Sequence, residues 1–239
     1  MDIFESWITT TPIANRGLYN DKIPENSLAA INRAVKQGYG ICVDVRALAD
    51  DTIVVFHDET LGRMTGTDGF INNCTHADIE DLVLNKTTEK IPTLQQVLAA
   101  VDGKVPIIVD IRNMDKVSFE KYVWKILKPY KGEYAVVSVN PYSLEWFKLN
   151  APTVKRGQVS SFFKNTDLPF SLRNAYKKMK FNKDVSEPNF ILYRCEDLPN
   201  RFVKKFKDLP LLAYHVKSKE AYDKVKKHVN NVVFDGFQF

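Results

Sequence analysis

Cysteine is scarce in this sequence, and extended apolar runs are missing. The 239 residues include three cysteines, Cys42, Cys74 and Cys195, none of them in CxxC spacing. This usage argues against a disulfide framework or a zinc site and fits a reducing compartment. No apolar run approaches the ~18 residues that span a bilayer, and the amino terminus lacks the basic and apolar regions of a secretion signal. We therefore expect a cytoplasmic protein without a transmembrane segment.

A large excess of charge of one sign is also missing. The formal net charge is +5, and most of the surplus lysines fall in helical patterns with a solvated charged face. No basic stripe interleaved with aromatics follows a nucleic-acid-binding module, so no nucleic-acid partner is expected. Apolar residues, by contrast, make up 44% of the chain. That fraction is enough for a packed core and argues against global disorder.

The apolar residues alternate between two patterns along the chain. Short β-rich runs are separated by segments long enough for a helix, which favours parallel strands joined by right-handed crossovers. The runs are centred near Ile13, Val43, Ile108, Val136, Val154, Ile191, Leu212 and Val233. This number of units in a chain of this length predicts an α/β fold, a (β/α)8 TIM barrel. A doubly wound open sheet is the alternative.

One further β-rich run carries the most informative residues. Residues 41–45 and 53–57 are separated by Asp50-Asp51, which is turn chemistry, so the two runs are expected to form a hairpin. The second run ends in His57-Asp58. An apolar run only needs to fill a core, and an imidazole beside a carboxylate has no packing reason to be there. We therefore expect His57 at the rim of the sheet.

Charged residues also gather at the ends of other predicted strands. Asp44 and Arg46 share one strand face, as do Asp110 and Arg112, because side chains two residues apart point the same way. In a parallel barrel, the strand ends and the loops after them form the active face. Carboxylates, guanidinium groups and one imidazole at that face suit an anionic substrate held partly through a divalent metal.

Several blocks of the sequence occur in the order and at the spacing of one known family. They are Ile13-Ala-Asn-Arg-Gly-Leu, Ile23-Pro-Glu-Asn-Ser-Leu, Gly40-Ile-Cys-Val-Asp-Val-Arg, Val54-Val-Phe-His-Asp-Glu-Thr-Leu, Ile91-Pro-Thr-Leu, Ile108-Val-Asp-Ile-Arg, Leu212-Ala-Tyr-His-Val and Val233-Phe-Asp-Gly-Phe. In these blocks the chain resembles the glycerophosphodiester phosphodiesterases. The resemblance implies a single TIM-barrel domain over residues 1–239, with a small insertion around residues 59–90.

The resemblance also implies catalytic roles. Members of the family open with Ala-His-Arg-Gly, in which the histidine works in acid/base catalysis and the arginine binds the phosphate. Arg16 matches the arginine, but Asn15 replaces the histidine, and an amide has no useful proton to give near neutral pH. Losing one general acid or base costs about 10²- to 10⁴-fold in rate. His57 matches the second catalytic histidine, and Glu25 matches a glutamate of the substrate-binding side.

Three positions are implied to bind a divalent cation, Mg²⁺ or Ca²⁺. The family has Glu-x-Asp on the second strand, where this chain has Cys42 and Asp44, and a further glutamate that corresponds to Asp110. Replacing a carboxylate by a thiol removes one negative charge and one hard oxygen donor. The shorter side chain of Asp110 sets its oxygens further from a site sized for glutamate. The implied metal site is therefore a weakened one.

The phosphate-binding side of the site is better kept. Arg112 stands where members have a phosphate-contacting lysine, and its planar fork suits phosphate. Tyr214 takes the place of a substrate-contacting aromatic, while His215 falls on the opposite strand face. We expect an enzyme, a phosphoric diester hydrolase acting on a small phosphodiester with reduced or altered activity. The alternatives are a pseudoenzyme that binds a phosphodiester without cleaving it and a barrel kept for a structural or interaction role.

One basic and aromatic segment lies outside these assignments. Residues 162–183 combine Phe170, Leu172 and Tyr176 with several lysines. A solvated helical lid is the first interpretation. Contact with a membrane surface is the alternative, and it would suit a lipid-derived substrate. The sequence carries no signal for an oligomeric state.

Overall fold

The strands form one sheet that closes on itself. The structure, a computed structural model, describes residues 2–113, 119–164 and 169–237. The hydrogen-bonded strand order is β1-β9-β8-β7-β6-β5-β4-β2-β3, and β1 also pairs with β2. The strands are β1 (Ile13–Asn15), β2 (Gly40–Ala47), β3 (Ile53–Val55), β4 (Ile107–Ile111), β5 (Tyr134–Ser138), β6 (Lys155–Ser160), β7 (Phe190–Arg194), β8 (Leu211–Val216) and β9 (Asn231–Phe234). Eight parallel strands close into a barrel and β3 is an extra strand, so the predicted TIM barrel is confirmed and the open sheet is wrong.

The pairing of β2 sets the geometry of the region that matters for function. β2 pairs with β3 in antiparallel register, with Val45 opposite Val55, which confirms the predicted hairpin. On its other edge β2 pairs in parallel with β4, and Asp44 lies opposite Asp110. Because directly paired residues point to the same face of a sheet, the two carboxylates are neighbours. β3 ends at Val55, so His57 follows the strand rather than ending it.

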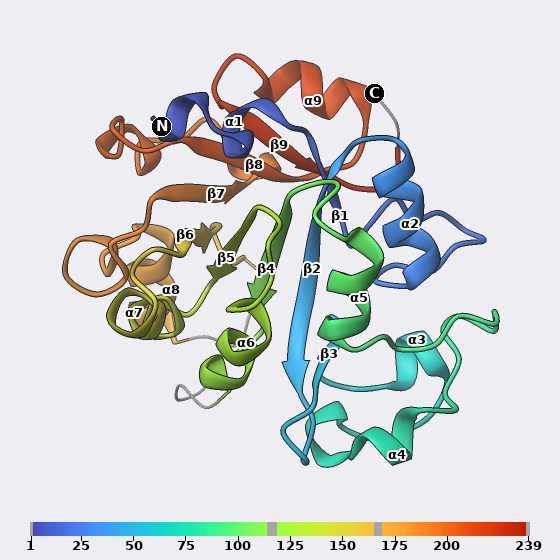
Figure 1. Cartoon of the computed structure of the whole chain (residues 1–239). Coiled ribbons are helices and arrows are strands. Elements are labelled where there is room, and N and C mark those ends of the chain that lie inside the picture. The colour runs from blue at the N-terminus through green and yellow to red at the C-terminus, as the bar shows by residue number, and fades with distance from the viewer. Residues whose placement is uncertain (1, 114–118, 165–168, 238–239) are drawn as a thin grey trace. The chain divides into compact units, whose positions relative to one another are not determined.

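Helices or single helical turns follow most of the strands (Figure 1). The α-helices are α1 (Trp7–Thr10), α2 (Leu28–Lys36), α3 (Gly62–Thr65), α4 (His76–Ile79), α5 (Leu94–Val101), α6 (Glu120–Leu127), α7 (Pro141–Asn150), α8 (Phe170–Lys177) and α9 (Lys219–Val225). Shorter turns are η1 (Ile3–Glu5), η2 (Ile71–Asn73), η3 (Asn182–Ser186), η4 (Cys195–Asp197) and η5 (Val203–Lys205). Within the segment predicted as a helical lid, residues 162–183, the helix α8 covers only Phe170–Lys177, and the turn η3 begins at Asn182.

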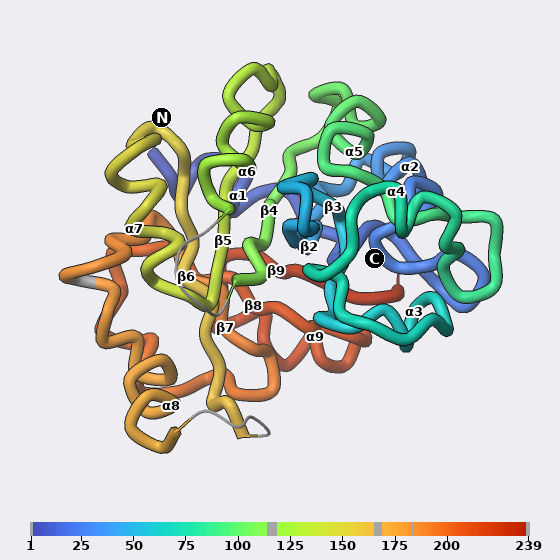
Figure 2. The backbone as a smooth tube through the Cα atoms, turned by 90° about the horizontal axis from the view of Figure 1, so that it is seen from below, coloured from blue at the N-terminus to red at the C-terminus, as the bar shows by residue number. Residues whose placement is uncertain are grey.

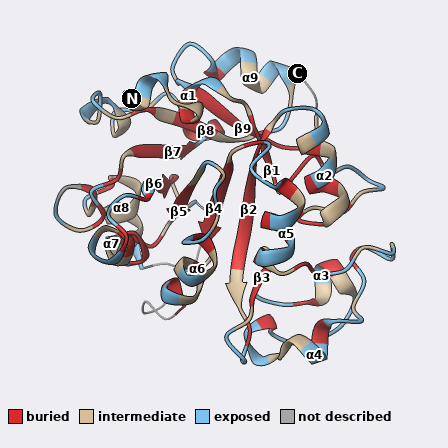
Figure 3. Ribbon diagram, viewed as in Figure 1, coloured by how far each residue is buried: buried red, intermediate tan, exposed pale blue. Residues whose placement is uncertain are grey.

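Local sequence explains where the longer helices begin. The Ser27 hydroxyl accepts a hydrogen bond from the Ala30 amide at 3.2 Å and caps α2. Thr93 and Gln96 form a capping box at the start of α5. Each cap satisfies amide groups that have no partner within the helix. In Figure 3 the strands are largely buried, and the exposed residues lie on helices and loops.

The chain divides into two compact units. One consists of Met1–Ile13, Asn113–Val117 and Ala135–Phe239, and the other of Ala14–Arg112 and Ser118–Tyr134. The second unit contains β2, β3 and β4, and its helices α2 and α5 lie side by side in Figures 1 and 2. A single domain over residues 1–239 stays a prediction. No helix within the described residues combines the length and apolar character needed to cross a bilayer.

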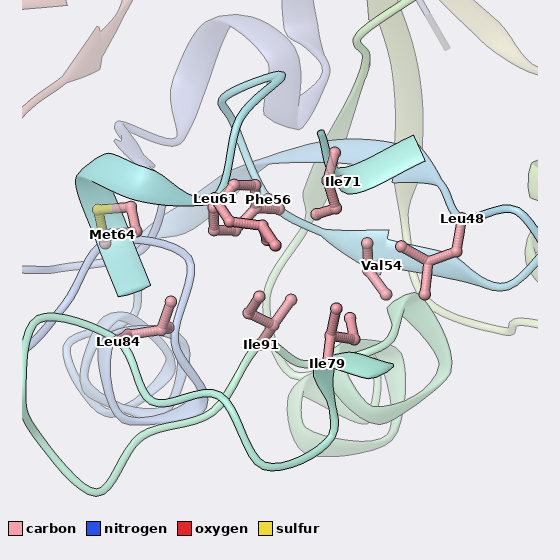
Figure 4. Packing of buried hydrophobic residues seen from close by; sticks show 9 residues of the cluster. All are labelled: Leu48, Val54, Phe56, Leu61, Met64, Ile71, Ile79, Leu84 and Ile91. Carbon is pink, nitrogen blue, oxygen red and sulfur yellow. The ribbon is translucent and has the colours of Figure 1, made fainter. Parts of the chain in front are cut away.

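The segment between β3 and α5 packs on the β2–β3 hairpin through a small apolar cluster. Figure 4 shows apolar side chains from α3, η2, α4 and the loops around them pointing toward one another. The cluster consists of Leu48, Val54, Phe56, Leu61, Met64, Ile71, Ile79, Leu84 and Ile91, all of them buried. Burying such side chains stabilises a fold by about 1.5–3 kcal/mol each. The segment predicted as an insertion around residues 59–90 therefore packs on the β2–β3 hairpin through this shared cluster. Its residue Arg63 extends to the site described next.

Candidate functional site

A tight turn after β1 fixes the first arginine of the site. Arg16 has a positive φ of 57°, and Gly17 follows with a φ of 76°. A Cβ atom on Gly17 would lie 2.7 Å from the carbonyl carbon of Ala30, so only glycine fits. The Arg16 amide donates to the Cys42 carbonyl at 2.6 Å, and the Arg16 carbonyl accepts from the Asn26 amide at 2.8 Å. The backbone at Arg16 is thus held on both sides.

The Arg16 side chain joins two carboxylates of the site. Its Nη1 atom donates to Glu25 Oε1 at 2.9 Å, and its Nε atom lies 3.0 Å from Asp44 Oδ2. Asp44 Oδ2 also accepts a hydrogen bond from Asn26 Nδ2 at 3.0 Å. Both Arg16 and Asp44 are largely buried, so this pairing is screened little by solvent. The predicted phosphate-binding arginine is therefore held rigidly by the predicted metal ligand.

Arg112 lies between the two paired aspartates. Its Nη1 atom is 3.3 Å from Asp110 Oδ2, and its Nε atom is 3.9 Å from Asp44 Oδ1. Burial alone would raise the pKa of Asp44, but Arg16, His57 and Arg112 outweigh burial and lower it. Burial prevails at Asp110, where it raises the pKa to about 6, with Asp44 adding to the rise and Arg112 opposing it. One of the two aspartates therefore holds its charge firmly, and the other takes up a proton in mild acid.

His57 is oriented by the carboxylate next to it in the sequence. Its Nδ1 atom lies 2.6 Å from Asp58 Oδ1. Burial would raise the pKa of Asp58, but hydrogen bonds from Arg63 and His57 bring it to about 2. An ionised carboxylate only accepts hydrogen bonds, so Nδ1 carries the proton and Nε2 is the proton acceptor. Burial also lowers the pKa of His57, and Arg112 and Arg16 act in the same direction, which keeps the imidazole neutral near pH 7.

Arg63, from α3, connects Asp58, the hydrogen-bond partner of His57, to Glu25. Its Nε and Nη2 atoms donate to the two oxygens of Asp58, and Nη2 also donates to Glu25 Oε1 at 2.6 Å. Glu25 Oε1 is the same atom that accepts from Arg16. An ion-paired network therefore runs from His57 through Asp58, Arg63 and Glu25 to Arg16. All of its members lie in the second unit.

Sequence reasoning missed part of this network. Asn26 was given no role at the site, although it stands beside Glu25 in the Pro-Glu-Asn block. Asp58 was noticed but given no role. Arg63, five residues after Asp58, was given no role, and the fold of the segment around α3 brings it back to the site. Arg46 also has a structural contact, since its Nε atom donates to the His57 carbonyl at 2.9 Å.

The three predicted metal ligands do not form a metal cage. Asp44 is already engaged by Arg16 and Asn26, and Cys42 presents a buried thiol. Asp110 Oδ1 is buried without a hydrogen-bond partner among the described residues, which leaves one oxygen for a ligand. Among the residues that the structure describes, no three His, Cys, Asp or Glu side chains are placed to hold a metal ion. With two guanidinium groups beside it, this donor set fits a hard divalent cation poorly.

The remaining predicted residues lie at defined places. Asn15 is the last residue of β1 and is buried, as is Cys42 in β2. Tyr214 lies in β8, in the first unit, where its ring is 5.2 Å from that of His215. His215 has a positive φ of 60° and lies at a register shift of the β8–β9 pairing. The role of Tyr214 in substrate binding stays a prediction.

Comparisons with known proteins agree on one family. Residues 16–235 match the model of the Glycerophosphoryl diester phosphodiesterase family. A protein named glycerophosphodiester phosphodiesterase from Caldanaerobacter subterraneus subsp. tengcongensis is 35% identical over 161 residues, which cover 62% of this chain and 65% of that protein. The chain thus spans about half to two thirds of the length of the curated relatives it matches first.

Solved structures agree on the fold. A phosphodiesterase of Oleispira antarctica in complex with the product sn-glycerol-3-phosphate superposes with a TM-score of 0.80 at 20% identity, covering 95% of this chain and 92% of that chain. A glycerophosphodiester phosphodiesterase of Thermotoga maritima superposes with a TM-score of 0.73 at 22% identity, covering 94% of each chain. At these identities the likeness establishes the barrel and leaves the chemistry to the residues themselves.

Proposed function

Because the chain belongs to the glycerophosphoryl diester phosphodiesterase family, we propose that it is a phosphoric diester hydrolase acting on glycerophosphodiesters with reduced or altered activity. The observation that carries this proposal is the neutral His57, held by Asp58 beside Arg16 and Arg112. A proton acceptor next to two guanidinium groups is what hydrolysis of an anionic ester needs. We also propose a cytoplasmic location, which the three free cysteines support.

Arg112 is the group proposed to bind the phosphate. Its side chain is 28% exposed, against 12% for Arg16. A guanidinium fork can donate two parallel hydrogen bonds to a phosphate and neutralise part of its charge. Arg16 is held by Glu25 and Asp44, and its guanidinium adds to the positive charge of the site. The phosphodiester is therefore expected to lie over Arg112 and beside His57.

His57 is proposed as the general base. The hydrogen bond from Nδ1–H to Asp58 fixes the ring and leaves Nε2 to accept a proton. In the proposed step, Nε2 takes the proton of a free glycerol hydroxyl of the substrate, whose oxygen bonds to phosphorus while the P–O bond to the alcohol breaks. The departing oxygen takes a proton from water, and a second water molecule then opens the cyclic phosphate. Asn15 can hydrogen-bond an ester oxygen but has no proton to deliver to it. We therefore expect departure of the alcohol to be slow, which lowers the rate.

No step of this mechanism runs through a metal ion. A divalent cation would neutralise phosphate charge in members of the family that bind one, and here Arg16 and Arg112 supply positive charge. We propose that the native chain binds Mg²⁺ or Ca²⁺ weakly. The support is the donor chemistry of Cys42, Asp44 and Asp110 described above.

Release of alcohol from glycerophosphocholine and glycerophosphoethanolamine tests the proposal. His57→Gln should lower the rate by at least about 100-fold, because it removes the base. His228→Gln is the matched control, since His228 is exposed at the end of α9. Unchanged hydrolysis in His57→Gln would overturn the assignment of the base.

A second candidate function is favoured by Asn15 and Cys42. The chain would then bind a phosphodiester without cleaving it, because proton-transfer and cation-binding groups are substituted while both arginines remain. The same assay distinguishes the two functions. A pseudoenzyme gives calorimetric binding of the diester, lost in Arg112→Gln, together with no alcohol release under any metal condition.

A further inference from the structure

Basic and aromatic side chains on and around α8 form an exposed surface in the first unit. Between Lys164 and Lys180 the sequence has several cations and a single carboxylate, namely Lys164, Arg173, Lys177, Lys178 and Lys180 against Asp167. No residue of α8 itself is fully buried. The short segment around η5 adds Arg201, Lys204, Lys205 and Lys207 against Asp208. We refer to the described side chains of α8, Lys164 and Arg201–Lys205 as the α8 surface.

The two segments are joined by packing beneath the charges. Phe162 lies with its ring centroid 6.1 Å from that of Phe202, in an edge-to-face arrangement. Lys177 Nζ lies over both rings, at 4.4 Å from the centroid of Phe162 and 5.3 Å from that of Phe202. Val203 packs on the same apolar cluster as Phe162. The α8 surface is therefore one continuous patch.

A pocket opens in this surface. Its volume is about 290 Å³, and it is lined by Phe162, Lys164, Phe170, Arg173, Asn174 and Lys177. Three of these side chains are cations and two are phenylalanines, and no carboxylate is among the described residues that line it. Such a lining suits an anionic group that is attached to an apolar one.

The positive charge of the pocket is only partly neutralised. Lys164 Nζ lies 3.6 Å from the buried Asp197. Arg173 and Lys177 have ring contacts but no ion-pair partner within the described residues; the Arg173 guanidinium lies 5.7 Å from the centroid of Phe170. Ring contacts leave the charge of a cation in place. Two cations of this pocket are therefore available to an external anion.

Phe170 gives the surface its apolar tip. It is 74% exposed, more than any other large hydrophobic residue in the described chain. Tyr142, on α7, is 48% exposed, and its ring stacks on Phe181, which in turn stacks on Tyr176 of α8. Exposed aromatic rings beside lysine and arginine are typical of surfaces that lie in the headgroup region of a membrane. A soluble anion or a nucleic-acid backbone would leave Phe170 in water.

We propose that the α8 surface docks the protein on a membrane that contains anionic phospholipids. Arg173 and Lys177 bind lipid phosphates, and Phe170 inserts among the acyl chains. This surface is distinct from the residues around His57, so the proposal goes beyond the hydrolytic function and does not rest on it. No covalent step is involved.

Sedimentation with lipid vesicles tests the proposal. The full chain should bind vesicles that hold about 30% phosphatidylglycerol and not vesicles of phosphatidylcholine alone, and binding should weaken as salt is raised to about 0.3 M. Arg173→Gln with Lys177→Gln should weaken binding on the order of 20-fold, about fivefold for each cation. Phe170→Ser should weaken it by about tenfold and leave the dependence on anionic lipid intact.

A charge-matched variant provides the control. Lys224→Gln with Lys227→Gln removes the same charge from exposed positions on and after α9, which lies apart from α8 in Figures 1 and 2. This variant should bind vesicles within about twofold of the native chain. Equal losses in both double variants would mean that net charge alone attracts the protein, and would overturn the proposal. The proposal would also be overturned if the native chain did not bind vesicles, or if Phe170→Ser bound them with the same affinity as the native chain.

Failure of this proposal and failure of the hydrolytic function are separable. His57→Gln should bind vesicles as the native chain does, since the vesicles hold no glycerophosphodiester. Circular dichroism and melting temperature of each variant establish that it is folded. If a soluble polyphosphate bound the native chain as tightly as vesicles do and failed to bind Phe170→Ser, that result would count against the lipid as the partner.

Discussion

His57 is the residue whose protonation decides what the site can do. We expect its imidazole to titrate below the ordinary value of 6.5, because burial disfavours the charged ring and Arg112 and Arg16 repel it. Asp58→Asn should lower this pKa further, because the Asp58 carboxylate favours the protonated ring. Proton NMR of the four histidines against pH measures both values, and His57→Gln assigns the signal.

The direction of this shift has two consequences. The unfolded chain takes up a proton at His57 that the folded chain resists, so the free energy of unfolding should fall as pH drops below 6.5. The acid limb of the hydrolysis profile should also lie below that value, because the neutral ring is the base. A His57 signal that titrates above 6.5 would contradict the role given to burial.

At the scale of the elements, β1 and β2 carry Asn15 and Cys42, two of the positions at which the chain departs from the pattern that the family resemblance implies. Asn15→His with Cys42→Glu should restore a general acid and a hard oxygen ligand next to Asp44. We expect the double variant to bind Mg²⁺ or Ca²⁺ in calorimetry, and hydrolysis to rise by about 10²-fold or more over the native chain.

The single variants are the controls for that change. Cys42→Glu alone buries a carboxylate, so its melting temperature should fall without metal and rise when Ca²⁺ is added. Asn15→His alone should leave metal binding unchanged. A native chain already as fast as the double variant would show that the substituted site is complete as it stands.

Single elements were predictable where their residues act locally. The hairpin of β2 and β3 followed from two β-rich runs around Asp50-Asp51. His57 was expected at the end of its strand but lies beyond it, because β3 stops pairing after Val55. The link from Arg63 to Asp58 and Glu25 was not predictable, since a packed segment of many residues brings it there.

For the whole molecule, the barrel was predictable because alternating strands and helices allow few closed arrangements. The charge states of the site residues were less predictable. Asp44 and Asp110 were identified as ligands from family positions, yet their pKa values move in opposite directions. That difference depends on Arg16, which lies 3.0 Å from Asp44, and on the hydrogen bond that Asn26 donates to the same carboxylate. No spacing in the sequence encodes these contacts.

Ligand binding should be visible in the stability of the whole chain. A ligand that binds only the native state, at about 100 times its dissociation constant, adds about 2.7 kcal/mol to the free energy of unfolding. For a chain of this size that corresponds to a rise in melting temperature of about 5–10 °C. We expect glycerophosphocholine to give such a rise in the native chain and His57→Gln, and a much smaller one in Arg112→Gln. No rise in any of the three would mean that the barrel binds no phosphate ester here and serves a structural or interaction role alone.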